Sequence, residues 1–326
     1  MLFKLQSLDG FDIIKLMTDM KYGFVFPGQG VQIVGMGMDL AQNFPVAQAV
    51  FDEVDSALGY SLSDIMFYGD MSQLTQTQNA QPAIMAVSVA LLRVIEAEVA
   101  PLTHLATAVA GHSLGEYSAL CAAGVLNLTD TAKLLQVRGR LMADAAQSQS
   151  GGMLALLGAD LLQAKEISEH TGCFVANDNC AGQVVLSGTN AALTAAKMMA
   201  DNMNIKRAVP LAVAGAFHSP MMADAAEKMT SILNQIQFNT PKIPIYFNVT
   251  AASESNPAIF PNLLKQQIAG TVRWRETVQN MPVDAFVECG QGTVLSGLIR
   301  RICPEKPVIN GSDTASVRNL IARLQK

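Results

Sequence analysis

One serine of this sequence lies in a turn that is typical of an enzyme nucleophile. Ser113 is the central residue of GHSLG (111–115), a GxSxG pattern between a predicted strand at 106–110 and a predicted helix. The two glycines permit the sharp turn that exposes a serine, and the N-terminus of the helix stabilises developing negative charge. In this context the pattern favours a nucleophile over an ordinary glycine-rich turn.

A serine hydroxyl is a weak nucleophile unless a base lies within hydrogen-bond reach. The chain has four histidines, His104, His112, His170 and His218. His218 is the best candidate because it follows a Gly-Ala-Phe turn and precedes a predicted helix, whereas His170 ends a predicted helix and His104 lies in a loop. Because neighbouring side chains diverge at a turn, we expect His112 to line the pocket or to bind a ligand carbonyl.

The sequence offers no obvious acid to orient His218. In α/β-hydrolases the acid falls between the serine and the histidine in chain order. Asp178 falls there but belongs to a separate predicted region, and Glu288 follows the histidine. A backbone or amide carbonyl that accepts the Nδ1 proton would orient the ring equally well. The missing acid therefore counts against a plain esterase.

Two glycine-rich turns, GQG at 28–30 and GQG at 290–292, each follow a predicted parallel strand. Both should open onto the same edge of the sheet as the serine turn. An oxyanion hole needs one N–H from the residue after the nucleophile and one from a neighbouring loop, and Leu114 and Gln29 occupy those positions. The alternative of a dinucleotide site is disfavoured, because the glycines of GQGVQIVG do not match GxGxxG.

The elements that must carry these residues follow an α/β pattern. A hydrophobic run predicts a long apolar helix over about 83–100, with Pro82 in its first turn. Shorter hydrophobic runs predict the strands of a parallel sheet, at 22–26, 106–110, 243–249 and 285–288. The middle third has instead the order β-α-β-β-α-β, which is ferredoxin-like. Its predicted strands are 153–157, 173–177, 183–187 and 206–211, and its predicted helices are 160–170 and 190–203.

This pattern predicts a small subdomain inserted into a larger one. The small subdomain is expected at 148–214, and the large subdomain from 22–147 and 215–326. Residues 1–21 are expected to be a leader of unknown role, or the product of an upstream start codon. They resemble neither a secretory signal nor an Arg-rich transit peptide.

Composition narrows the classes of function. The 22 Lys and Arg against 27 Asp and Glu give a net charge of −5, which argues against a nucleic-acid partner. Half of the residues are hydrophobic, which supports a large core and excludes disorder. No apolar run of spanning length is free of charges, so we expect no membrane association. The five cysteines and four histidines lack metal-site spacing, so we expect no metal and a cytoplasmic location. We also expect no cofactor.

Six motifs, in this order, resemble those of malonyl-CoA:acyl carrier protein transacylases. They are FPGQG (26–30), GHSLGE (111–116), VRG (137–139), GQVV (182–185), GAFHS (215–219) and ExGxG (288–292). The resemblance covers the chain from 22 to about 305, and an ordered set is far more specific than any one motif. Two departures are Val31, where a small polar residue is usual, and the leader, which has no counterpart in the family.

The resemblance implies an α/β-hydrolase-like large subdomain with a parallel sheet, a ferredoxin-like small subdomain, and an active site in the cleft between them. It makes Ser113 the acyl nucleophile and His218 its base. It places the oxyanion hole at the amides of Gln29 and Leu114. It also implies that a glutamine carbonyl orients the histidine, and that glutamine aligns with Gln267, which accounts for the missing acid.

The resemblance also makes Arg138 the partner of the malonyl carboxylate. A planar guanidinium can bind a carboxylate through two parallel hydrogen bonds, whereas the nearby Arg140 better fits a solvated surface charge. Phe217, which precedes the histidine, matches the malonyl-selective pattern of related acyltransferases and would fill the space that an α-methyl group needs.

The implied function is a two-step transfer. Malonyl-CoA acylates Ser113, and the phosphopantetheine thiol of acyl carrier protein then takes the malonyl group, which supplies fatty acid synthesis. We expect the protein to be a monomer. Three alternatives stay open: a trans-acting acyltransferase of a polyketide pathway, a general serine hydrolase, and a non-catalytic module that binds a carrier protein.

Overall fold

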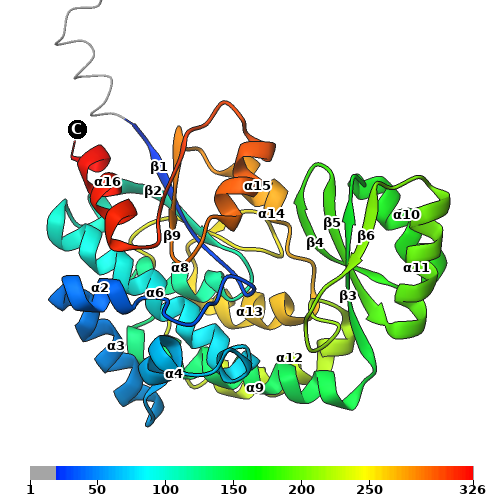
Figure 1. Cartoon of the computed structure of the whole chain (residues 1–326), viewed down its shortest axis with the longest axis horizontal. Helices are drawn as coiled ribbons and strands as arrows, with labels where there is room; N and C mark the ends of the chain where they lie inside the picture. The colour runs from blue at the N-terminus through cyan, green and yellow to red at the C-terminus, as the bar shows by residue number, and fades with distance from the viewer. Residues whose placement is uncertain (1–19, 326) are drawn as a thin grey trace, which may run out of the picture.

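Two β-sheets, each with its own helices, organise residues 20–325, the part of the chain that the computed structural model describes (Figure 1). The predicted leader, 1–21, lies outside the described residues except for Met20 and Lys21. The chain forms the first two strands of the large sheet, enters the small unit once and returns to form the other four strands of the large sheet.

The large sheet has the strand order β10-β9-β1-β2-β7-β8. Its strands are β1 (Tyr22–Phe26), β2 (Ala106–Gly111), β7 (Ile245–Tyr246), β8 (Ser253–Glu254), β9 (Ala285–Cys289) and β10 (Val308–Gly311). All neighbours pair in parallel except β7 and β8. The central strands are apolar and buried because helices cover both faces, as in other parallel sheets.

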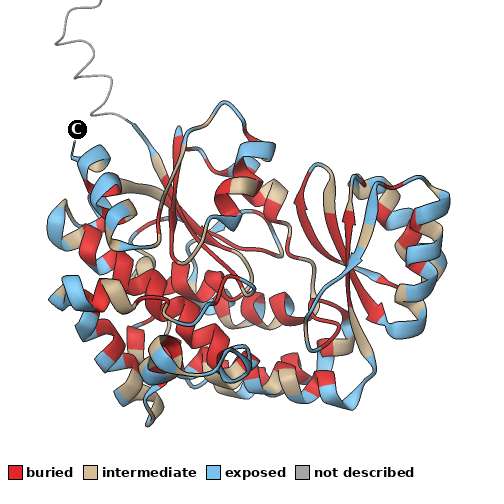
Figure 2. Cartoon of the chain, in the orientation of Figure 1, coloured by how far each residue is buried: buried red, intermediate tan, exposed pale blue. Residues whose placement is uncertain are grey.

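Helices pack around this sheet, and the most buried of them lie on one side of it (Figure 2). The α-helices of the large unit are α2 (Met38–Asn43), α3 (Pro45–Leu58), α4 (Leu62–Tyr68), α5 (Met71–Leu74), α6 (Thr77–Glu98), α7 (Leu102–Leu105), α8 (Gly115–Ala122), α9 (Leu128–Ser148), α12 (Ala223–Leu233), α13 (Phe260–Ala269), α14 (Trp274–Asn280), α15 (Val294–Ile302) and α16 (Thr314–Leu324). Helix α6 is long and apolar enough to cross a membrane, but 83% of its most apolar window is buried within the protein. It is therefore a core helix of this fold.

Two sequence predictions in the large unit need correction. The helix expected at 83–100 begins already at Thr77, so Pro82 lies inside α6 and not in its first turn. The polar residues before Pro82 are helical because they are buried against other elements. The strand expected at 243–249 is confined to Ile245–Tyr246, because the chain turns back at Phe247, which exchanges backbone hydrogen bonds with residues 251 and 252.

The small unit has the predicted β-α-β-β-α-β order. Its elements are β3 (Gly151–Leu157), α10 (Leu161–Thr171), β4 (Phe174–Cys180), β5 (Gln183–Thr189), α11 (Asn190–Asn202) and β6 (Arg207–Pro210). The sheet order β4-β5-β3-β6 is antiparallel throughout, as in ferredoxin-like folds. The chain is thus α/β with two subdomains, while the boundaries at 148 and 214 stay a prediction.

One edge of the small sheet is attached to the large subdomain. The backbone N–H of Asp178 in β4 donates to the carbonyl of Val272 at 3.0 Å, and the N–H of Val272 donates to the carbonyl of Ala176 at 2.9 Å. The carboxylate of Asp178 is 2% exposed and receives two guanidinium nitrogens of Arg275, the closer at 2.8 Å. These contacts hold β4 beside the cleft between the subdomains.

Candidate active site

The turn that carries Ser113 depends on its two flanking glycines. Ser113 has a φ of 53°, in the left-handed region that side chains rarely adopt. A Cβ on Gly111 would lie 1.8 Å from the carbonyl oxygen of Gly115, and a Cβ on Gly115 would lie 2.2 Å from the carbonyl oxygen of Phe26. The strand-to-helix turn can close only because both residues lack a side chain, and it presents the serine hydroxyl at the strand end.

Asn248, which sequence reasoning missed, holds this turn in place from the turn that follows the neighbouring strand β7. Its Oδ1 accepts from the backbone N–H of Ser113 at 2.8 Å, and its Nδ2 donates to the carbonyl of Gly111 at 2.7 Å. Its own backbone N–H donates to Glu116 Oε2 at 2.6 Å. No sequence signal singled it out, because Asn248 falls inside the strand expected at 243–249 and not at the end of that strand.

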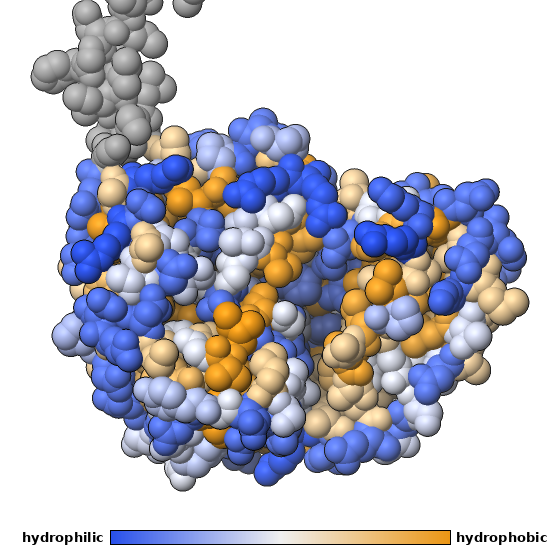
Figure 3. Space-filling view, in the orientation of Figure 1, coloured by the Kyte–Doolittle hydropathy of each residue, from blue (hydrophilic) through white to orange (hydrophobic). Residues whose placement is uncertain are grey.

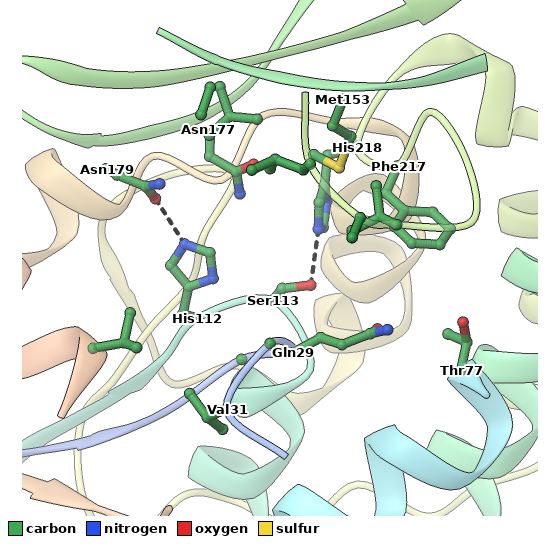
Figure 4. Close-up of a pocket in the computed structure, with 18 of the residues that line it drawn as sticks. Gln29, Val31, Thr77, His112, Ser113, Met153, Asn177, Asn179, Phe217 and His218 are labelled. Atoms are coloured by element: carbon green, nitrogen blue, oxygen red, sulfur yellow. Dashed lines mark hydrogen bonds between the residues drawn. The ribbon is translucent and has the colours of Figure 1, made fainter. Parts of the chain in front are cut away.

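His218 lies against the nucleophile. Its Nε2 is 2.8 Å from Ser113 Oγ (Figure 4). Its Nδ1 is 2.8 Å from the backbone carbonyl oxygen of Gln267. The N–H at Nδ1 donates to that carbonyl, so Nε2 is left as the acceptor for the serine proton. Burial, and next the positive charge of Arg138, lower the pKa of His218 to about 3. The ring is therefore neutral at physiological pH and can accept a proton.

Neither of the two acids considered from the sequence contacts His218. Asp178 pairs with Arg275 in the connection between the subdomains. Glu288 accepts from the backbone N–H groups of Leu295 and Ser296, at 3.0 and 2.7 Å, and so caps the start of α15. The site contains a serine and a histidine oriented by a backbone carbonyl.

The side chain of Arg138 extends from α9 toward Ser113, and the residue is 1% exposed. Its Nη1 donates to Gln81 Oε1 at 2.7 Å, while its Nη2 donates to Gln267 Oε1 at 2.8 Å and lies 3.2 Å from Ser113 Oγ. Its guanidinium also lies 5.6 Å from the centre of the Tyr117 ring. A cation is thus held beside the serine hydroxyl, where it can meet an anionic group of an acyl chain.

Gln267 forms hydrogen bonds with Ser113, His218 and Arg138. Besides its backbone carbonyl on His218 and its Oε1 on Arg138, its Nε2 donates to the backbone carbonyl of Ser113 at 2.8 Å. This residue is fully buried in α13. One glutamine therefore links the nucleophile, the base and the cation.

Gln29 and Leu114 lie on the loops that follow β1 and β2. These strands pair in parallel with Phe26 opposite Gly111, so the loops are neighbours. Among residues 20–325, no acceptor is recorded for the backbone N–H of either Gln29 or Leu114. Both amides are therefore available to an oxygen that develops negative charge near Ser113, and their role as an oxyanion hole stays a prediction.

His112 and Phe217 line the same cavity, which has a volume of about 280 Å³. His112 Nε2 lies 2.9 Å from Asn179 Oδ1, and burial lowers the pKa of His112, so the neutral ring donates its proton to that amide oxygen. Phe217 is 6% exposed, and Figure 4 shows it on the opposite side of His218 from His112. Figure 3 shows the cleft as a hollow between the subdomains, with hydrophobic residues at its rim.

The described residues hold no group of three or more His, Cys, Asp or Glu side chains that could bind a metal ion. All five cysteines are buried and unpaired.

Comparisons with known proteins identify the family of this chain. The family model for the acyl transferase domain matches residues 23–323. The malonyl CoA-acyl carrier protein transacylase of Bacillus subtilis is 38% identical over 315 residues, which cover 94% of this chain and 98% of that protein. The crystal structure of an acyl-carrier-protein S-malonyltransferase from Bartonella henselae is 43% identical, with a TM-score of 0.90 over 94% of this chain and 100% of that one.

A further solved relative is a malonyl-transacylase in complex with its type II PKS acyl-carrier protein. It is 36% identical to this chain, with a TM-score of 0.88, and the match covers 93% of this chain and 99% of the other. The family match spans both subdomains and all the motifs that predicted it. This chain therefore belongs to the acyl transferase domain family.

Proposed function

We propose that this protein transfers a malonyl group from malonyl-CoA to the phosphopantetheine thiol of an acyl carrier protein, through an ester on Ser113. The observation that carries the proposal is the position of Arg138, a buried cation 3.2 Å from the serine hydroxyl. An acyl group bound as an ester on Ser113 would bring a terminal carboxylate to that guanidinium. Charge-assisted, two-point pairing is what guanidinium groups do best.

In the first step His218 acts as the base. Its Nε2 takes the proton of Ser113 as Oγ attacks the thioester carbonyl, and the resulting oxyanion is held by the amides of Gln29 and Leu114. The carbonyl of Gln267 stabilises the imidazolium that forms. When the tetrahedral intermediate collapses, the carbon–sulfur bond breaks and CoA leaves as a thiol with the proton from His218.

The second step reverses the roles. The carrier thiol gives its proton to His218 and attacks the ester carbonyl, and the bond from the carbonyl carbon to Ser113 Oγ breaks. The serine oxygen then recovers the proton from His218, so atoms and charge balance over the cycle. No triad carboxylate is needed, because the neutral carbonyl of Gln267 orients the ring.

The names of the relatives support the carrier protein as partner, and one relative was solved with such a protein bound. We further propose that the protein acts as a monomer in the cytoplasm, that it needs no cofactor, and that the subdomain boundaries lie near 148 and 214. His112 lines the pocket in this proposal, and Phe217 restricts the acyl group beside the reacting carbon.

A second candidate is service to a polyketide carrier, favoured by the relative that was solved with a type II PKS acyl-carrier protein. The two candidates share every step above and differ only in the acceptor. Comparing kcat/KM for a fatty-acid carrier with that for a polyketide carrier, at equal malonyl-CoA, separates them. The higher value identifies the acceptor.

The direct test of the proposal is the intact mass of the protein after brief incubation with malonyl-CoA. A malonyl increment is expected on the wild type and should disappear when holo-acyl carrier protein is added. Ser113→Ala should show no increment while its thermal unfolding stays close to that of the wild type. An increment that persists on Ser113→Ala refutes the nucleophile. Release of the increment to water as fast as to the carrier thiol would identify a hydrolase.

A further inference from the structure

Arg138 is a buried cation whose hydrogen-bond partners are all uncharged. Its guanidinium donates to the side-chain oxygens of Gln81 and Gln267, and it lies close to Ser113 Oγ. Within the described range, 20–325, no carboxylate forms an ion pair with it. Buried charges in proteins are normally paired, because removing them from water is costly. The wall of the cavity thus holds a positive charge without a counter-charge.

A carboxyl group in the same region, Glu116, does not supply that counter-charge. Burial raises the pKa of Glu116 to about 8, although the backbone N–H of Asn248 and the charge of Arg138 oppose the rise. The group is therefore mostly protonated at neutral pH. Its Oε2 is engaged by the backbone of Asn248 and not by the guanidinium.

Gln81 owes its place beside Arg138 to a close approach of two helices. A Cβ on Gly139 of α9 would lie 2.4 Å from the carbonyl oxygen of Thr77 in α6, so only glycine allows this packing. Gln81 is 1% exposed, and its amide is held at both ends: Oε1 accepts from Arg138 and Nε2 lies 3.8 Å from Met142 Sδ. The amide therefore presents its oxygen to the guanidinium in a fixed direction.

We propose that Gln81 is a specificity-determining residue, which orients Arg138 without neutralising it, so that the site selects acyl groups that carry their own carboxylate. This inference rests on the proposed function. An amide oxygen accepts a hydrogen bond but adds no charge, so the guanidinium still attracts an anion. A carboxylate at the same position would pair with Arg138 internally and would repel the carboxylate of the substrate.

The test compares Gln81→Glu with Gln78→Glu, a matched change on the same helix. Gln78 does not line the cavity, and its Nε2 donates to Gln76. We measure kcat/KM for malonyl-CoA and for acetyl-CoA, with the same holo-acyl carrier protein as acceptor. In Gln81→Glu the value for malonyl-CoA should fall by about 100-fold while that for acetyl-CoA changes little, because only malonyl meets a like charge. Gln78→Glu should keep the wild-type ratio.

A second variant separates orientation from folding. Gln81→Leu removes the acceptor of Nη1 without adding charge, so the ratio of malonyl to acetyl kcat/KM should fall by about 10-fold, less than in Gln81→Glu. Thermal unfolding is recorded for each variant. If the ratio in both Gln81 variants stays within experimental error of the wild type, or if both substrates fall equally, the inference is overturned. If the wild type itself does not transfer malonyl, the proposed function fails instead.

Discussion

The backbone carbonyl oxygen of Gln267 lies 2.8 Å from Nδ1 of His218, where the triad of a serine hydrolase has a carboxylate. A carbonyl orients the ring as well as a carboxylate does, but it gives less support to the imidazolium. Arg138 adds a positive charge nearby, which further disfavours protonation of His218. The base is therefore well placed and strongly held in its neutral form.

Removing the base should slow acylation without abolishing substrate binding. For His218→Ala we expect kcat for malonyl transfer to fall by about 10²- to 10⁴-fold, the usual contribution of a positioned general base. Rapid-quench measurement of malonyl-enzyme formation checks this. Acylation at the wild-type rate would mean that another group takes the serine proton.

The pH dependence of kcat/KM should lack the acid limb of an ordinary histidine. His218 must be neutral to act, and burial together with Arg138 lowers its pKa to about 3, so it stays neutral as the pH falls from 7 to 5. An unshifted ring would be about 97% protonated at pH 5, and the rate would drop accordingly. We expect a nearly flat profile, measured with a return to pH 7 to exclude unfolding. A limb centred near the ordinary value would contradict this shift.

Arg138 separates malonyl transfer from general acyl transfer. Arg138→Ala removes charge-assisted hydrogen bonds of about 1.5 to 3 kcal/mol each, so kcat/KM for malonyl-CoA should fall by at least about 10-fold. Acetyl-CoA has no carboxylate to lose, and its kcat/KM should be unchanged or higher. Arg138→Lys should rescue poorly, because an ammonium cannot reproduce the planar contact. Equal losses for both substrates would make the arginine purely structural.

Phe217 should limit the substituent at the α-carbon of the acyl group. Its ring is buried beside the base and lines the cavity. The wild type should favour malonyl-CoA over methylmalonyl-CoA by about 10- to 200-fold, the range for a single methyl group in an apolar pocket. Phe217→Ala should reduce this preference in a competition assay that contains both thioesters. A preference that is unchanged in the variant would exclude Phe217 as its cause.

Asn248 should matter to stability and to rate, because it satisfies two backbone groups of the serine turn. Asn248→Ala leaves the N–H of Ser113 and the carbonyl of Gly111 without their partners. Each unsatisfied buried group costs about 1 to 3 kcal/mol, so with two such groups the free energy of unfolding should fall by about 2 to 6 kcal/mol, and kcat should fall with it. Denaturant unfolding and steady-state kinetics measure the two effects. Wild-type stability would show that water replaces the amide at no cost.

The elements that sequence predicts best are those with a local signature. The GxSxG turn is specified within five residues, and the β-α-β-β-α-β order follows from alternating hydrophobic runs separated by turn residues. The strand at 243–249 was overestimated because its apolar run continues past the point where the chain turns at Phe247. Hydrophobic residues indicate that a segment is buried, but here both the strand and the turn that follows it are buried, so hydrophobicity does not show where the strand ends.

The residues that sequence could not find act through contacts between distant segments. Asn248 reaches Ser113 across 135 positions, and Gln81 reaches Arg138 across 57. Neither lies in a spaced pattern, and an asparagine after a short strand or a glutamine in a polar helix start is common in any protein. Only the packing of α6 against α9, and the adjacency of β2 and β7, brings these amides to the site.

The attachment of β4 to the segment around Val272 has a consequence for how this protein unfolds. Separating the subdomains would expose an unpaired sheet edge and leave the buried carboxylate of Asp178 without Arg275. Both costs oppose a state in which one subdomain is folded and the other is not. The two subdomains, although each has its own core, are therefore expected to melt in one cooperative transition, and the inserted segment is expected to be less stable alone than in the whole chain.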